Sequence, residues 1–374
     1  MAVSLVAATN VVQAGYSGGP MNYVGGGDSC NPCNPCAPCP SLCGTGGNWG
    51  LRADLLWWSA NVDGGLPYGT VDSTVVNSTA ALSTFLGDVR TLDFKWKPGF
   101  RLGLGYDLSC DCDSWDFQLL WTHIRPHANG STDLNPSGLE RFVPAWGVGF
   151  GANSFTNDFT GFTKATASWR LHFDLLDFEL GRDFHVSNCL SVRPFIGVRG
   201  GWIKQNFNIS IYDSTGLLRE GVHLGTEFAG VGLRTGLNSE WRLGCGFSLY
   251  GNGAFSIIYG TQKNPVAVAL ANASTLLSPY VPTNAQHHDF DASRAILDAS
   301  AGIRWTTFFC CDTISLSFAF GWDQIYLWNQ SGFDNINLGL PSITNPGTVQ
   351  ATNPQFNVYD LSLKGITFSL ALGF

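Results

Sequence analysis

Residues 314–322 read ISLSFAFGW, and this run decides the fold class. Large apolar side chains occupy every second position, at Ile314, Leu316, Phe318, Phe320 and Trp322. A period of two places alternate side chains on opposite faces of a β-strand, whereas a helix repeats every 3.6 residues. The run therefore predicts a strand with one apolar face and one face of small or polar residues.

The same period recurs in residues 100–107, 115–122, 169–175, 297–305 and 366–374. With four fainter runs these predict ten strands, at residues 49–60, 90–108, 114–125, 165–184, 191–210, 224–241, 246–260, 291–308, 313–328 and 356–374. Each is about the length that a tilted β-strand needs to cross a bilayer. The pattern predicts an all-β fold, a transmembrane antiparallel up-and-down β-barrel.

Composition agrees with a membrane barrel. Only 13% of the 374 residues are charged and 13% are aromatic, yet the mean hydropathy is just +0.06. Strands with one lipid-facing and one polar face average to this value. No run of 18 apolar residues occurs, which excludes a helical membrane protein. The net charge of −8 argues against nucleic acid as a partner.

The predicted connections alternate in length. Long ones cover residues 61–89, 126–164, 211–223, 261–290 and 329–355, and short ones cover residues 109–113, 185–190, 242–245 and 309–312. Long extracellular loops and short periplasmic turns are typical of outer-membrane barrels. A strand-like run at residues 146–150 leaves the count open between ten and sixteen. Breaks in the alternation at Leu175/Leu176 and near Leu363/Gly365 predict β-bulges.

The chain divides into three predicted parts. Residues 1–14 resemble a truncated signal peptide that lacks the positive n-region, residues 15–47 form a flexible periplasmic segment rich in Cys, Pro and Gly, and residues 48–374 form the barrel. Phe374 closes the last alternating run with an aromatic residue. This resembles the signal that the outer-membrane barrel assembly machinery reads. The expected location is the cell outer membrane, with membrane lipid as a partner.

Strand parity predicts which side chains line the lumen. The predicted lining residues are Arg52, Asp54, Arg101, Asp116, Arg170, His172, Asp174, Arg193, Arg199, Arg234, Arg294, Asp298, Arg304 and Asp323. Eight arginines against five aspartates would favour anions, because charge on a pore wall sets selectivity. The alternative is that these groups pair with one another and fill a narrow barrel.

The eleven cysteines all fall outside the long connections. Five lie in the tail, at Cys30, Cys33, Cys36, Cys39 and Cys43, and six lie in or beside short turns, at Cys110, Cys112, Cys189, Cys245, Cys310 and Cys311. By the predicted topology all face the periplasm, an oxidising compartment that favours disulfides. Neighbouring turns stand about 10 Å apart, so bridges to the tail or to cysteine-rich envelope proteins are expected.

The tail spacing also leaves other readings open. Cysteines at every third position are interleaved with prolines, which favours polyproline II and lines the sulfurs along one edge. Repeated C-x-x-C spacing also matches zinc or iron–sulfur ligands. Prolines stiffen the turns such sites need and no histidine lies nearby, so we expect no metal and no cofactor. A disordered tail without a role is the third reading.

Several segments resemble the major outer membrane proteins of chlamydiae and related intracellular bacteria. The segments are residues 97–106 (KPGFRLGLGY), 114–116 (SWD), 121–122 (WT) and 191–203 (SVRPFIGVRGGWI). The resemblance extends over residues 48–374 and implies an oligomeric, typically trimeric, general porin that is also a structural surface protein. The Cys-Asn-Pro repeats have no counterpart that we can place in that family.

A porin for small solutes and ions has two alternatives. Omptin-type proteases use Asp and His in a ten-stranded barrel, and His172 and Asp174 share a predicted lumenal face. They lie mid-strand, however, and Asp111-x-Asp113 falls in a periplasmic turn, so we expect no enzyme. The long loops are also compatible with a non-conducting structural or adhesive barrel.

Overall fold

The structure, a computed structural model, describes residues 48–72, 87–108, 115–134, 141–146, 162–187, 189–270, 284–309, 314–335 and 355–374. The predictions for residues 1–47 and for Cys110, Cys112, Cys310 and Cys311 lie outside these residues. The one helix among the described residues is a short 3-10 turn, Asp63–Gly65. No helix in this part of the chain is long and apolar enough to span a membrane. The all-β prediction is confirmed.

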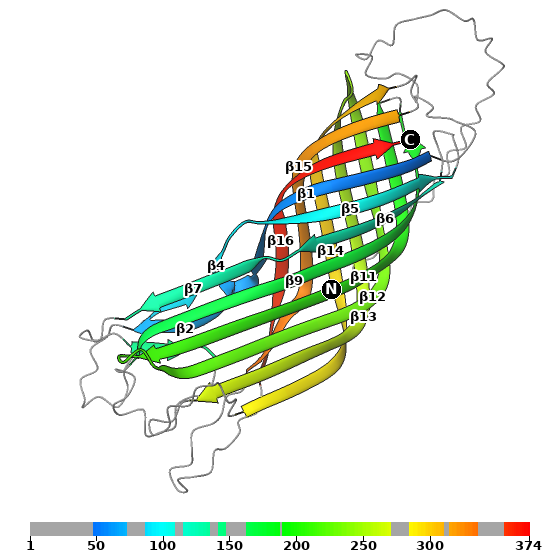
Figure 1. The fold of residues 1–374 in the computed structure, drawn as a ribbon. Helices are drawn as coiled ribbons and strands as arrows, with labels where there is room; N and C mark the ends of the chain where they lie inside the picture. The colour runs from blue at the N-terminus through cyan, green and yellow to red at the C-terminus, as the bar shows by residue number, and fades with distance from the viewer. Residues whose placement is uncertain are drawn as a thin grey trace, which may run out of the picture. The chain divides into compact units, whose positions relative to one another are not determined.

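Ten antiparallel strands pair in a closed ring (Figure 1). In ring order they are β1 (Asn48–Val62), β5 (Lys97–Asp107), β6 (Trp115–Ile124), β9 (Phe162–Arg182), β11 (Leu190–Asp213), β12 (Leu218–Gly244), β13 (Phe247–Leu270), β14 (Asn284–Phe309), β15 (Ile314–Asn335) and β16 (Gln355–Gly373). Each predicted strand range overlaps one of them. The ring closes where β16 pairs with β1, and Trp49 and Phe374 exchange backbone hydrogen bonds of 2.8 and 2.9 Å.

Short strands lie in the predicted long connections 61–89 and 126–164, beside the short one at 185–190, and at the start of the predicted strand 90–108, which is wrong before Lys97. They are β2 (Pro67–Asp72), β3 (Gly87–Thr91), β4 (Asp93–Phe94), β7 (His127–Asp133), β8 (Arg141–Pro144) and β10 (Phe184–His185). Strands β3, β2 and β8 form a separate three-stranded sheet, whereas β7 pairs with β9 and carries β4. The strand-like run predicted at residues 146–150 begins after β8 ends, and residues 147–150 are not described.

The ring has a turn end and a loop end. At the turn end β1 begins, β16 ends, and the β9–β11 and β12–β13 hairpins turn. Cys245 and Gly246 both have positive φ there, as a two-residue type I′ turn requires. At the loop end the predicted long connection 211–223 is wrong. Strands β11 and β12 continue through most of it and are joined by residues 214–217 alone.

The outer surface near the turn end is an apolar belt. Its exposed side chains include Leu51, Leu55, Leu102, Leu104, Leu119, Phe178, Ile196, Val198, Val231, Leu233, Phe255, Ile257, Ile303, Phe318, Phe320, Phe368, Leu370 and Leu372. Leu233 is 69% exposed, far more than an apolar side chain in a soluble core. Exposed aromatics border this belt, with Trp49, Trp115, Trp241 and Trp305 near the turn end and Trp57, Trp96, Trp202 and Tyr259 on the opposite side.

The interior of the ring has two layers. Near the turn end the inward side chains are polar and charged, and toward the loop end most are apolar, with a smaller set of buried polar ones that includes Gln205, Thr226, Gln262, Asn264 and Arg294. We call the second layer the apolar plug, and it consists of Leu56, Trp58, Ile124, Leu171, Phe173, Leu175, Ile203, Phe228, Ile258, Ile296, Ile325, Leu327, Leu361 and Leu363. Every ring strand except β5 contributes to it.

The apolar plug explains the two breaks in the alternation. Strand pairing runs without a register shift through Leu175/Leu176 and through Leu363/Gly365, so the predicted β-bulges are wrong. Leu175 faces inward at 1% exposure, and Leu176 faces outward at 39%. The apolar side chains change faces because the interior changes from polar to apolar at this level.

Candidate functional site in the lumen

The polar layer holds ten of the fourteen predicted lining residues, namely Arg52, Asp54, Arg101, Asp116, Arg193, Arg199, Arg234, Asp298, Arg304 and Asp323. They come from nearly every part of the ring, because each strand presents alternate residues to the interior. Arg294 also points inward, but it lies in the apolar half, over the ring of Phe228, and donates to Gln262.

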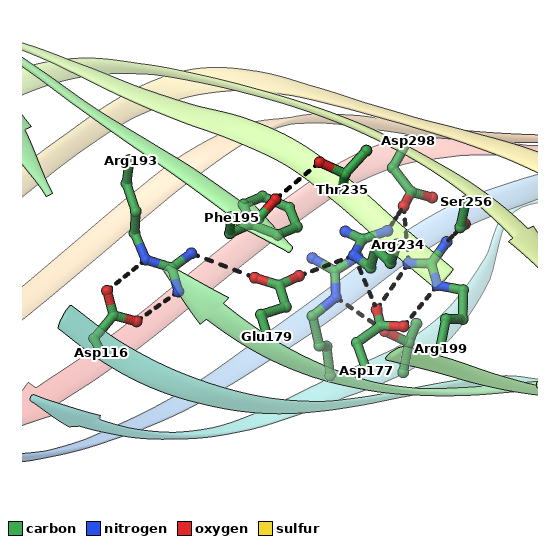
Figure 2. A network of polar contacts seen from close by, with 12 residues as sticks. Asp116, Asp177, Glu179, Arg193, Phe195, Arg199, Arg234, Thr235, Ser256 and Asp298 are labelled. Carbon is green, nitrogen blue, oxygen red and sulfur yellow. Dashed lines mark hydrogen bonds and ion pairs between the residues drawn. The ribbon is translucent and has the colours of Figure 1, made fainter. Parts of the chain in front are cut away.

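Arg199 is the centre of a buried ion-pair network (Figure 2). Its Nε and Nη2 donate to the two carboxylate oxygens of Asp177 at 2.6 and 2.7 Å, and Nη2 lies 2.8 Å from Asp298. Nη1 donates to Ser256 at 3.1 Å. The Arg199 side chain is only 2% exposed, so water contributes little to its solvation. Such a charge is tolerated only when paired and hydrogen-bonded.

The network continues through Arg234 and Arg193 (Figure 2). Arg234 contacts Asp298 and donates from Nε to Glu179 at 2.9 Å. Arg193 donates from Nη1 to the other oxygen of Glu179 at 3.4 Å and grips Asp116 through Nε and Nη2 at 2.7 and 2.5 Å. A chain of charges therefore joins β6, β9, β11, β12 and β14 across the lumen.

A second group of charges lies beside the first. Arg52 donates to Asp54 at 2.8 Å, and Arg101 lies 3.3 Å from Asp54 and 3.1 Å from Asp323. Arg304 pairs with Glu240. Through these contacts six inward arginines are matched by seven carboxylates, at Asp54, Asp116, Asp177, Glu179, Glu240, Asp298 and Asp323. The predicted excess of positive charge on the wall is wrong.

Two cavities remain in this half of the ring. One of about 320 Å³ is lined by the charged residues of the polar layer together with Asn238, Asn252 and Ser300. The other, of about 280 Å³, lies toward the turn end among Gly50, Gly105, Ser315 and Ala371. The polar layer could hold water or small polar solutes. Toward the loop end the described residues of the apolar plug fill the lumen.

Three predicted lining residues face outward. Arg170, His172 and Asp174 alternate on β9 with the buried Leu171, Phe173 and Leu175, so the prediction that they line the lumen is wrong. Asp174 accepts instead from His123, whose Nδ1 lies 2.6 Å from its carboxylate, and from Trp121 Nε1 at 3.2 Å. The rule that polar side chains face the lumen fails here because the interior at this level is apolar.

Asp177, Glu179 and Glu240 are lining residues that the sequence reading missed. A signal was present for the first two, because Asp177 and Glu179 alternate with the exposed Leu176 and Phe178. Glu240 lies near the turn end of β12, where the alternation with Trp241 is short. Among the described residues no group of three or more His, Cys, Asp or Glu side chains could hold a metal ion.

An antiparallel ring with an apolar outer belt and a polar inner layer defines an outer-membrane β-barrel protein. The family described as Legionella pneumophila major outer membrane protein precursor matches residues 42–374. The chain belongs to this family, and its location is the cell outer membrane. The predicted membership of an outer-membrane protein family is confirmed, and the family is the Legionella one. The resemblance to the chlamydial proteins in particular stays a prediction.

Solved structures that align with most of the chain share little sequence with it. The outer membrane protease OmpT from Escherichia coli is 9% identical, with a TM-score of 0.36, over 87% of this chain and 96% of OmpT. A Pseudomonas aeruginosa FadL homologue is 9% identical, with a TM-score of 0.26, over 90% and 92%. The P. putida toluene transporter TodX is 9% identical, with a TM-score of 0.27, over 89% and 91%. No curated protein matches the chain.

Proposed function

We propose that this protein is a structural β-barrel of the outer membrane whose interior is closed to passive diffusion. The apolar plug is the observation that carries the proposal. Trp58, Leu171 and Phe173 each have an exposure of 0%, and together with the rest of the plug they fill the lumen between the polar layer and the loop end. The polar side chains at this level, Gln205, Thr226, Gln262 and Asn264, are themselves fully buried, so they offer hydrated ions and sugars no solvated path.

The proposed placement puts the apolar belt in the hydrocarbon core. Aromatic residues that border a lipid-facing band are typical of both membrane interfaces. The turn end, where the described hairpins are short, is assigned to the periplasm, and the loop end to the cell exterior. The ten-stranded ring is then the transmembrane barrel that the sequence predicts.

A porin is the second candidate, and the polar cavities favour it. The cavity of about 320 Å³ is lined by charged and amide side chains, as a solute path would be. Conduction through it would require the apolar plug to move. Solute-dependent swelling of liposomes distinguishes the two candidates. Sugar entry at the rate of a general porin would favour the porin, and impermeability would favour the closed barrel.

We also propose that disulfides tie the barrel to cysteine-rich envelope proteins. The positions of Cys189 and Cys245 support this proposal, since both lie in hairpin turns at the turn end. An odd total of eleven cysteines leaves at least one for a partner outside the chain. Links of this kind would stiffen the envelope from its periplasmic side.

The cysteine proposal predicts a labelling pattern. A membrane-impermeant thiol reagent on intact, reduced cells should leave Cys189 and Cys245 unlabelled, because they face the periplasm, and should label both once the envelope is opened. Without reductant the protein should migrate as high-molecular-weight species that collapse to monomer on reduction. Labelling of Cys189 on intact cells would contradict the orientation. A monomer before reduction would contradict the cross-linking role alone.

A further inference from the structure

A patch of positive charge lies on the outer surface, beyond the apolar belt. We call it the outer basic patch, and it consists of Lys97 on β5, Arg125 after β6, Arg170 and His172 on β9, and Lys204 on β11. Strand pairing brings the last three together, because Lys204 lies opposite His172 and Arg170 lies two residues along β9. His127 on β7 pairs with Arg170 and links the patch to Lys97.

Local contacts show that these charges act on one another. The Nζ atom of Lys97 lies 2.8 Å from Nε2 of His127. Burial lowers the pKa of His127, and the nearby positive charges of Lys97 and Arg170 lower it further. A lowered pKa is expected for a histidine in a region of positive potential.

Acidic side chains compensate only part of this charge. Glu227 forms an ion pair with Lys204, and Asp174 accepts hydrogen bonds from His123 and Trp121. Among the described residues no carboxylate lies within ion-pair distance of Lys97, Arg125 or Arg170. Arg125 and Arg170 are both exposed. Three cations are thus free to bind an anion.

The patch begins where the lipid-facing surface ends. Outward residues on β6 run from Trp121 to His123 and then to Arg125. On β11 the exposed Trp202 is followed at the next outward position by Lys204. Aromatic side chains at this position mark the level of lipid headgroups. The basic side chains therefore stand beside the headgroups and not far out in solvent.

The other six strands of the ring carry more acids than bases at this level. Their outward charged residues include Asp63, Glu227, Lys263, Asp289, Asp291, Asp360 and Lys364, five acids against two bases. Lys263 and Lys364 each lie two strands from the patch, because Glu227 on β12 separates Lys263 from Lys204 and β1 separates β16 from β5. The excess of positive charge is thus confined to β5, β6, β9 and β11. A uniform solubilising surface would show no such segregation.

We propose that the outer basic patch binds the phosphate groups of an anionic lipid in the outer leaflet of the membrane. Arg125 and Arg170 supply the main contacts, because guanidinium groups match phosphate oxygens with paired hydrogen bonds. Lys97 and Lys204 add charge on either side, and Trp121 and Trp202 pack against the acyl chains below. The site rests on the proposed orientation, in which the loop end faces the cell exterior.

Equilibrium binding of fluorescent lipid A to the full-length refolded protein in detergent micelles tests the site. Bisphosphorylated lipid A should bind at least about tenfold more tightly than its dephosphorylated form. The double variant R125Q/R170Q should weaken binding about 30-fold or more, since hydrogen bonds between charged groups are the strong ones. The variant R125K/R170K, which keeps both charges, should retain most of the affinity. K263Q/K364Q, which removes two cations that flank the patch at a distance of two strands, should change it less than twofold.

Three results would overturn the proposal. Equal losses in R125Q/R170Q and K263Q/K364Q would mean that net charge alone drives binding. Equal affinity for the dephosphorylated lipid would remove the phosphate from recognition. Complete displacement by inorganic phosphate at millimolar concentration would assign the site to the free anion. Binding in micelles does not depend on orientation or on closure of the lumen, so these results leave the proposed structural role to its own tests.

Discussion

Replacement of Arg199 by alanine is expected to lower the free energy of unfolding by about 3–5 kcal/mol, because removal of one partner strands buried charges. The R199A variant would leave Asp177 without its bidentate donor and would remove one of the two arginines that contact Asp298. Both carboxylates are largely buried, at 5% and 16% exposure, so water in the adjoining cavity can replace the guanidinium only in part. Urea unfolding of protein refolded into lipid vesicles, followed by tryptophan fluorescence, measures the change.

Arg304 provides the matched control for this prediction. It also pairs across the lumen, with Glu240, but the two side chains are 30% and 28% exposed near the turn end. R304A should therefore cost about 1 kcal/mol or less, as partly solvated pairs do. Equal losses in the two variants would contradict the conclusion that the Arg199 network is the dry, tightly coupled part of the lumen.

Replacement of Trp58 by alanine should cost a similar amount, about 3–5 kcal/mol, because it empties a large volume in the apolar plug. Trp58 is fully buried, donates from Nε1 to Thr367 at 3.1 Å, and lies under the guanidinium of Arg101. The same urea titration in lipid vesicles measures the loss.

Trp57, the preceding residue, is the matched control for W58A. It points outward in the row of aromatics that borders the apolar belt and is 45% exposed. W57A removes the same side chain from the membrane interface and should cost about 1 kcal/mol, since lipid and interfacial water fill the space. A larger loss in W57A than in W58A would reverse the assignment of inner and outer faces on β1.

The sequence predicts the ring strands well, because period-two alternation marks a strand whichever face is inside. The turn at Cys245–Gly246 was located to within a few residues, whereas the β11–β12 connection was placed wrongly. Near residues 211–223 apolar side chains such as Ile211 and Val222 face inward beside the buried Asp213 and Glu220, and Tyr212 and His223 face outward. Where a strand continues beyond the apolar belt, apolar side chains move from its outer face to its inner face. This change breaks the alternation in the sequence and so resembles the end of a strand.

The lumen could be predicted only where the interior is polar. Arg52, Asp54 and Arg199 follow the rule that the polar face looks inward, and the structure places them there. His172 and Asp174 face outward instead, because they lie on the part of β9 whose inward side chains belong to the apolar plug. Ion pairs such as Arg199–Asp298 could not be predicted from the sequence, because strands β11 and β14 are not neighbours in the ring and their side chains meet only across the interior.

Single-channel recording from the refolded full-length protein in planar lipid bilayers tests whether the apolar plug closes the lumen. The unaltered protein should insert without producing discrete conductance steps, because the plug residues and the polar side chains among them are buried and leave no solvated path across the ring. Regular steps of uniform size from the unaltered protein, at moderate voltage and with the ring shown to be folded, would contradict the claim and establish the porin instead.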